Sequence, residues 1–174
     1  MSLPSRLLFD MNALRYLDQL GLLEVCISAI QDPCTLDLIR MQEMRKPTWE
    51  DVVPYGMRSC ELSSEMMTEA VTLMSGSPKL SIYDAGLIVL AKESGLPIVT
   101  EDGAMVKVMS RQKVLHVSVP EMVDLLVGAE IISREVAVGL FQRLSAELLP
   151  GCDERYPEIV GKYLRGDGMG GNDV

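Results

Sequence analysis

Short apolar runs alternate with segments of helical periodicity along most of the chain. Continuous apolar runs are typical of strands buried on both faces of a parallel sheet, whereas apolar residues spaced three and four apart are typical of amphipathic helices. The apolar runs predict strands at residues 6–9, 23–28, 96–100 and 114–118. Helical spacing predicts helices at residues 13–20, 34–44, 63–74, 82–94, 103–110, 120–127, 133–149 and 156–164. We therefore expect an α/β fold, a three-layer α/β/α sandwich with a central parallel sheet.

Capping signals mark where several of these helices begin and end. Asp32-Pro33 predicts the start of the helix at 34–44, with Asp as N-cap and Pro at the first helical position. Ser81 and Asp84 have the spacing of a capping box, with Asp in place of the usual Glu, and Gly95 predicts the end of that helix.

Domain organisation follows from where the predicted sheet ends. The last strand lies before residue 120, and the amphipathic segment 133–149 lies well beyond it. We expect an α/β domain at 1–128, a helical C-terminal extension at 129–165, and a disordered tail at 166–174 that is rich in glycine.

Composition excludes some classes of protein but does not indicate a specific reaction. The 174 residues carry a net charge of −9, which argues against binding nucleic acid through a broadly basic surface. A nuclease with a carboxylate-lined metal site remains compatible with that charge. The four cysteines form no CxxC pair, and the chain has one histidine, so a structural zinc site is not expected. No apolar run reaches membrane-spanning length and no secretory signal is visible, so we expect reduced thiols, no membrane association and a cytoplasmic location.

Four aspartates follow predicted strands or fall in the first turns of predicted helices. Asp10 directly follows the strand at 6–9, and Asp102 follows the strand at 96–100. Asp84 and Asp37 lie near the starts of helices. The carboxyl ends of parallel strands meet at one edge of the sheet, where ligands bind in open α/β folds. We therefore expect these four carboxylates on the same side of the sheet.

Each of these acids also has a purely structural interpretation. Asp10 could close a turn with Asn12, Asp84 could complete a capping box, and Asp102 could cap the helix that follows it. Asp37 opposes the dipole of its helix, which alone favours a structural role. The four acids together are harder to explain this way. Several carboxylates without a basic partner repel one another unless cations intervene. The hard ions Mg²⁺ and Mn²⁺ prefer such oxygen ligands, and they support phosphodiester hydrolysis by activating water and stabilising the developing charge.

Three blocks of the sequence resemble a known family. LLFDMNAL, ISAIQDPCTLDLI and SIYDAGLIVLAKESGLPIVTEDGAMVKV are similar to the signature blocks of the PIN domain, over about Leu7 to Val119. That family comprises metal-dependent ribonucleases, among them the toxins of type II toxin–antitoxin modules. The resemblance implies a PIN-like nuclease domain with an acidic quartet that binds one or two Mg²⁺ or Mn²⁺ ions.

Residue roles follow from the same resemblance. It implies that Asp10, Asp84 and Asp102 are metal ligands, that Asn12 hydrogen-bonds nearby and that Thr100 positions water or the metal shell. The family usually places a Glu about one turn into the helix after the second strand, where this chain offers Asp37. Asp is one methylene shorter, which leaves metal binding by Asp37 through water as the expectation. Glu43, farther along, is the second choice for this position.

The leading hypothesis is therefore a Mg²⁺- or Mn²⁺-dependent endoribonuclease, of which a toxin-type RNase is one form. RNA is then the substrate, and an antitoxin or other protein is a candidate partner. Cations near the cleft would have to meet the RNA backbone, and the candidates near in sequence are Lys92, Lys107, Arg111 and Lys113. The alternative is a catalytically weak or inactive PIN-like scaffold that binds a protein partner. The segment Ser133–Leu149 either packs on the domain or mediates a homodimer, and the sequence leaves both open.

A receiver-like phosphoacceptor domain is a weaker hypothesis for the same acids. Such a domain needs an acidic pair at the end of the first strand, which Asp10-Met11 lacks. It also needs a Lys at the end of a late strand, where His116 and Ser118 stand.

Overall fold

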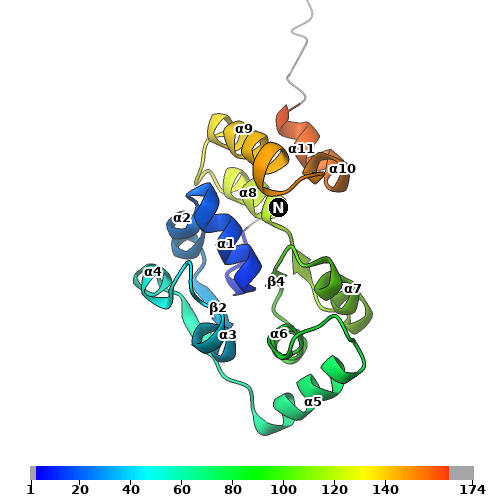
Figure 1. The fold of residues 1–174 in the computed structure, drawn as a ribbon. Coiled ribbons are helices and arrows are strands. Elements are labelled where there is room, and N and C mark those ends of the chain that lie inside the picture. Colours follow the sequence, from blue (N-terminus) through cyan, green and yellow to red (C-terminus); the bar gives the residue numbers. More distant parts are fainter. Residues whose placement is uncertain (1–2, 165–174) are drawn as a thin grey trace, which may run out of the picture. The chain divides into compact units, whose positions relative to one another are not determined.

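A five-stranded parallel sheet forms the centre of the fold in the computed structural model, which describes residues 3–164 (Figure 1). The strands lie in the order β3-β2-β1-β4-β5. Their bounds are β1 Arg6–Phe9, β2 Asp32–Leu36, β3 Arg58–Cys60, β4 Ile98–Val99 and β5 His116–Val117. In the register of the sheet, Leu8 of β1 lies between Cys34 of β2 and Ile98 of β4. The predicted α/β fold with a central parallel sheet is confirmed.

Helices connect every strand to the next. The first part of the chain contains α1 (Met11–Leu20), α2 (Leu23–Ala29), α3 (Asp37–Gln42), α4 (Trp49–Val52), the 3₁₀ turn η1 (Val53–Tyr55), α5 (Ser64–Ser75), α6 (Ile82–Ser94) and α7 (Gly103–Gln112). The later part contains α8 (Val119–Gly128), α9 (Arg134–Arg143), the π-helical turn η2 (Leu144–Leu148), α10 (Cys152–Arg155) and α11 (Pro157–Leu164).

Both faces of the sheet are covered. Leu8 belongs to a buried cluster with residues of α6 and α7. Because side chains alternate along a strand, Leu7 and Phe9 point to the opposite face, and they too are fully buried. This arrangement is consistent with a three-layer α/β/α sandwich. Helix α6 is apolar over the whole stretch Ala85–Ala91, all of it buried, as expected for a helix packed inside the domain.

The direction of strand addition reverses between β1 and β4. From β1 the chain adds β2 and then β3 on one side, and it then returns to add β4 and β5 on the other side of β1. The carboxyl ends of β1 and β4 therefore form a topological switch point, where open α/β sheets bind ligands. Asp10 directly follows β1, and Thr100 directly follows β4.

The sequence interpretation was wrong between residues 22 and 44. The predicted strand at 23–28 is the helix α2, whose buried residues Leu23, Cys26 and Ile27 have helical spacing. The predicted helix start at Asp32-Pro33 is instead the beginning of β2. Proline lacks an N–H, but it is tolerated near the first residue of a strand. The helix that follows begins at Asp37, three residues later than predicted.

Strand β3 was not predicted. It has three residues and no buried apolar run, because it lies at the edge of the sheet. Its first residue, Arg58, donates a hydrogen bond of 2.9 Å to Asp32, the first residue of β2. Arg6, the first residue of β1, donates to the other oxygen of Asp32 at 2.7 Å. These two ion pairs neutralise Asp32 at the amino edge of the sheet.

The chain divides into two compact units, Leu3–Val119 and a second unit that begins at Pro120. All five strands lie in the first unit, and α8 falls mostly in the second, whereas the sequence placed the boundary at 128. Within the second unit, Ser133 caps α9 and Phe141 stacks on Tyr163 at 4.7 Å between ring centroids. The predicted disordered tail, 166–174, lies outside the described residues. Among residues 3–164, no helix is both long and apolar enough to cross a membrane.

Candidate active site

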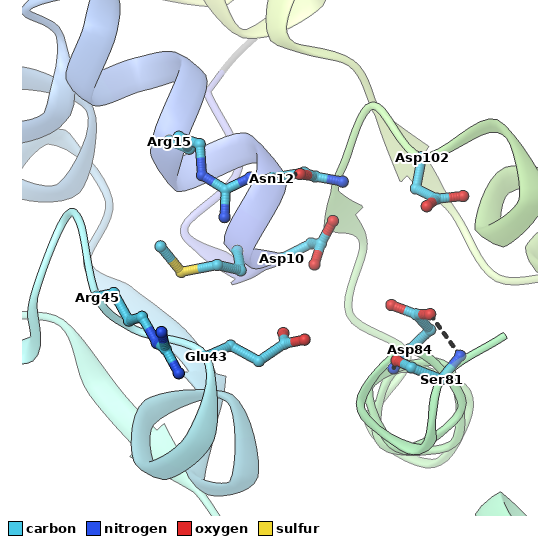
Figure 2. Close-up of a pocket in the computed structure, with 9 residues that line it drawn as sticks. Asp10, Asn12, Arg15, Glu43, Arg45, Ser81, Asp84 and Asp102 are labelled. Atoms are coloured by element: carbon cyan, nitrogen blue, oxygen red, sulfur yellow. Dashed lines mark hydrogen bonds between the residues drawn. The ribbon is translucent and has the colours of Figure 1, made fainter.

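A cleft of about 430 Å³ opens at the carboxyl edge of the sheet, where strand order reverses (Figure 2). Its lining combines four acids with two arginines and three other side chains: Asp10, Glu43, Asp84, Asp102, Arg15, Arg45, Met11, Asn12 and Ser81. Figure 2 shows the carboxylates of Asp10, Glu43 and Asp84 pointing into the same space, with Arg15 and Arg45 on the opposite side from Asp84 and Asp102. Three of the four acids predicted for the site line this one cleft.

Asp10 lies at the floor of the cleft and is 4% exposed. Pairing of β1 with β4 positions it, because the Asp10 N–H donates to the carbonyl of Val99 at 3.1 Å. The Thr100 hydroxyl donates to Asp10 Oδ2 at 2.7 Å. Burial raises the pKa of Asp10 to about 6, and the negative charges of Asp84 and Glu43 add to this increase, against the opposing hydrogen bond from Thr100. The protein therefore keeps a carboxylate here at a cost in free energy.

Asp84 combines the two roles that the sequence left open. Its Oδ2 accepts a hydrogen bond of 2.8 Å from the Ser81 N–H, and the Ser81 hydroxyl accepts from the Asp84 N–H at 3.1 Å. This capping box starts α6. The same carboxylate lines the cleft. The cap therefore holds the side chain in place without removing it from the site.

Asp102 also caps a helix while lining the cleft. Its Oδ1 accepts from the backbone N–H groups of Ala104 and Met105 at 2.7 and 2.9 Å, at the start of α7. Its own N–H donates to the Thr100 hydroxyl at 3.1 Å. Thr100 thus connects Asp10 to Asp102, since one hydroxyl donates to the first and accepts from the second. The role predicted for Thr100, to position water or the metal shell, stays a prediction.

The second acid of the cleft is Glu43, and Asp37 is not among its lining residues. Asp37 is the first residue of α3, and its Oδ1 accepts from the neighbouring Leu38 N–H at 2.8 Å. Glu43 lies six residues later, so at about 100° per residue it leaves the helix on a different face. Burial raises the pKa of Glu43, and the nearby charge of Asp84 raises it further, whereas Arg15 lowers it. The misplaced second strand explains why the sequence favoured Asp37 over Glu43.

The two cations of the cleft, Arg15 and Arg45, were not predicted from the sequence. Arg15 lies one turn into α1 and donates to Asn12 Oδ1 at 3.2 Å, which gives the predicted Asn12 a defined contact. Arg45 follows α3. Both arginines are exposed, and helical spacing between positions 12 and 15 was the one available signal for the first of them.

The four cations chosen by sequence proximity lie elsewhere. Lys92 forms an ion pair of 2.6 Å with Glu69. Lys107 and Arg111 line a separate pocket beside α7. Lys113 ends α7 in a left-handed conformation and lines neither pocket. Glu101, the neighbour of Asp102 in the chain, accepts a hydrogen bond of 2.6 Å from the Val119 N–H.

The chemistry of these donors suits a hard divalent cation, because every acidic ligand offered is a carboxylate. The cleft is open, however. Among residues 3–164, no three Asp, Glu, His or Cys side chains lie close enough together to ligate one ion directly. An ion held here would keep several waters, which is the usual way in which Mg²⁺ is bound by one or two carboxylates.

Comparison with known proteins adds no relative to this picture. No family model, curated protein sequence or solved structure matches the chain.

Proposed function

We propose that this chain is a Mg²⁺- or Mn²⁺-dependent endoribonuclease of the PIN type, acting in the cytoplasm. The observation that carries the proposal is the convergence of Asp10, Glu43, Asp84 and Asp102 on one cleft at the topological switch point. Burial is the main cause of the raised pKa values of Asp10 and Glu43, and the negative charge of Asp84 raises both further. A cation bound among these acids would relieve that repulsion, which supports the proposal.

In this proposal the acids hold the ion, and Glu43 takes the role that was predicted for Asp37. When bound, the ion supplies a lowered pKa for a water nucleophile and stabilises the charge that develops on the phosphate. Thr100 keeps Asp10 oriented, and the helix caps keep Asp84 and Asp102 oriented. Preorganised ligands of this kind need no further ordering when substrate arrives.

The arginines give the cleft its substrate preference. Arg15 and Arg45 lie on the opposite side of the cleft from Asp84 and Asp102 (Figure 2) and provide positive charge for the scissile phosphate or its neighbour. Arginine suits this task because its planar group can bind two phosphate oxygens at once.

The test is cleavage of a labelled single-stranded RNA in the presence of millimolar Mn²⁺. We expect wild-type protein to cut the RNA, and we expect Asp10→Asn combined with Asp84→Asn to be inactive. Asn preserves shape and capping ability but removes the negative charges. The matched control is Asp37→Asn combined with Asp32→Asn, which removes the same charge outside the cleft and should leave cleavage intact. Equal activity of wild type and the Asp10/Asp84 variant would refute the proposal.

A second candidate is a scaffold of the same fold that binds a protein partner, for example an antitoxin, without catalysis. One observation favours it: the described residues contain no direct three-ligand group for a metal ion. Calorimetry with Mn²⁺ separates the candidates. The nuclease predicts binding that disappears in the Asp10/Asp84 variant, whereas the scaffold predicts no heat of binding at millimolar metal.

A further inference from the structure

A second pocket of the first unit carries positive charge where the first carries negative charge. It has a volume of about 190 Å³ and lies between α7 and the loop that joins α5 to α6, a loop that runs beside α7 in Figure 1. We call it the α7 pocket. Its lining contains three cations, no acid, and otherwise small or apolar residues: Lys79, Lys107, Arg111, Gly76, Ser77, Pro78, Leu80, Ala104 and Val108.

One face of α7 forms a wall of this pocket. Ala104, Lys107, Val108 and Arg111 are spaced by three, one and three residues, which places them on the same side of the helix. Lys107 and Arg111 are therefore neighbours on consecutive turns. Lys79 joins them from the loop. Three like charges face one small volume, in a chain whose net charge is −9.

Among residues 3–164, no side chain neutralises the charges of the α7 pocket. Within the described part of the chain, Lys79, Lys107 and Arg111 make no ion pair and no side-chain hydrogen bond. Lys92, a surface lysine of the same unit, shows the contrast, because it is paired with Glu69 at 2.6 Å. Exposed lysines are usually only solvated, but a concave cluster with no acid in its lining concentrates a positive potential.

The two pockets are adjacent along two segments of chain. Ser81 lines the acidic cleft while Leu80 lines the α7 pocket, and Asp102 lines the cleft while Ala104 lines the α7 pocket. At 1.5 Å per helical residue, Lys107 and Arg111 lie about 7.5 and about 13.5 Å along α7 from the Asp102 cap. A strand held in the cleft would reach them with its next backbone phosphates.

We propose that the α7 pocket binds backbone phosphates of the single-stranded RNA next to the scissile bond. This inference rests on the proposed nuclease function and deepens it, because it assigns an extended RNA strand as substrate. An acidic protein segment is the competing ligand class, and contiguity with the acidic cleft favours the nucleic acid. A cation held by the four carboxylates would bind a phosphodiester of the RNA strand, whereas an acidic peptide carries no phosphate to place there.

The test measures RNA binding without cleavage. A fluorescent single-stranded RNA is titrated with full-length protein in EDTA, and its anisotropy is followed at several salt concentrations. The pocket variant is Lys107→Gln with Arg111→Gln, and the matched control is Lys92→Gln with Lys113→Gln, so both lose two positive charges. Each contact with single-stranded backbone contributes about 0.7 to the slope of log K against log salt. We expect the pocket variant to lower that slope by about 1.4 and to bind about 25-fold more weakly at 0.1 M salt.

The outcomes separate this inference from the proposed function. A weakened pocket variant beside an unchanged control supports the phosphate subsite, whatever the cleavage assay shows. Equal binding by both variants overturns the subsite, and it leaves the nuclease proposal standing if wild type still cuts RNA in Mn²⁺. Failure of wild type to bind RNA overturns the subsite as well. A labelled polyglutamate peptide that binds wild type as tightly as RNA does, and loses affinity with the pocket variant, also overturns the RNA assignment.

Discussion

Asp32 and Asp10 stand at opposite edges of the same sheet, and their surroundings differ in one respect. Asp32 opens β2 at the amino edge, where Arg6 and Arg58 from the flanking strands reach both of its oxygens. The hydrogen bond from Arg6 and the charge of Arg58 hold its pKa below the ordinary value. Asp10 follows β1 at the carboxyl edge, where its side-chain partner is a neutral hydroxyl and the charges that shift its pKa are negative.

The charge of Asp32 is used within the fold, whereas the charge of Asp10 is available for a ligand. At the amino edge the protein supplies its own counter-ions, so nothing further is needed there. At the carboxyl edge a buried acid stands with its pKa raised to about 6, in a cleft shared with three more carboxylates. In the metal-free protein, substitutions at these two edges should therefore have opposite effects on stability.

Asp10→Asn should stabilise the metal-free protein at high pH. A carboxyl whose pKa rises from 3.8 to about 6 on folding is favoured when protonated, so its contribution is intact below about pH 4 and is lost as pH rises through 6. At 1.36 kcal/mol per unit, the loss is about 3 kcal/mol. We expect the free energy of unfolding of the variant to exceed that of wild type by up to this amount at pH 8 and to equal it at pH 4, as measured by denaturant unfolding in EDTA. A gain of equal size at both pH values would contradict this.

Glu43→Gln should lower RNA cleavage in Mn²⁺ on the order of 100-fold, which corresponds to about 2.7 kcal/mol of transition-state stabilisation. Asp37→Asn should leave the rate within a factor of two, because Asp37 does not line the cleft. The two substitutions remove the same charge from the same stretch of chain. Initial cleavage rates of the two variants are measured side by side. A larger loss of rate for Asp37→Asn than for Glu43→Gln would identify Asp37 as the second acid.

Mn²⁺ should stabilise the wild-type protein and not the Asp10→Asn/Asp84→Asn variant. A ligand present at about tenfold its dissociation constant contributes about 1.4 kcal/mol. Thermal unfolding with and without Mn²⁺ measures this. Asp32→Asn is the control and should respond like wild type, since its carboxylate already has two cationic partners.

Asp32→Asn should destabilise the protein by about 1 kcal/mol, the opposite sign from Asp10→Asn. The pKa of Asp32 is lowered on folding, so its contribution is present above its unfolded pKa and is lost as pH falls through the folded value. Unfolding at pH 7 should show the loss, and raised salt should diminish it because Arg6 and Arg58 are largely exposed. A loss that does not change with salt would point to packing in place of charge.

Local signals predicted the parts of the fold and site that depend on neighbours in sequence. The capping box at Ser81 and Asp84, the N-cap at Asp102 and the left-handed Gly95 all appear in the structure as expected. The region from 22 to 44 failed because Leu22–Ala29 is apolar enough to fit a strand or a helix, and the choice depends on packing.

The remaining errors have the same origin. Arg15 of α1 shares one cleft with Glu43 and Arg45, which follow α3, because the sheet brings these segments together. No spacing rule relates positions 15, 43 and 84. The edge strand β3 has no apolar pattern of its own, so its pairing with β2 could be found only in three dimensions.

The hydrogen bond between Thr100 and Asp10 joins residues 90 positions apart in the chain, whereas the Ser81–Asp84 cap closes within four residues. Closing a long loop costs conformational entropy before its contacts form, so pairings between distant residues form slowly. Asp84 can take its place as soon as α6 nucleates, but Asp10 can do so only when β1 has paired with β4. Any partly folded chain that lacks this pairing lacks the acidic site. The time at which Mn²⁺ binding appears during refolding would therefore report when β1 pairs with β4, the pairing that joins the residues farthest apart in the chain.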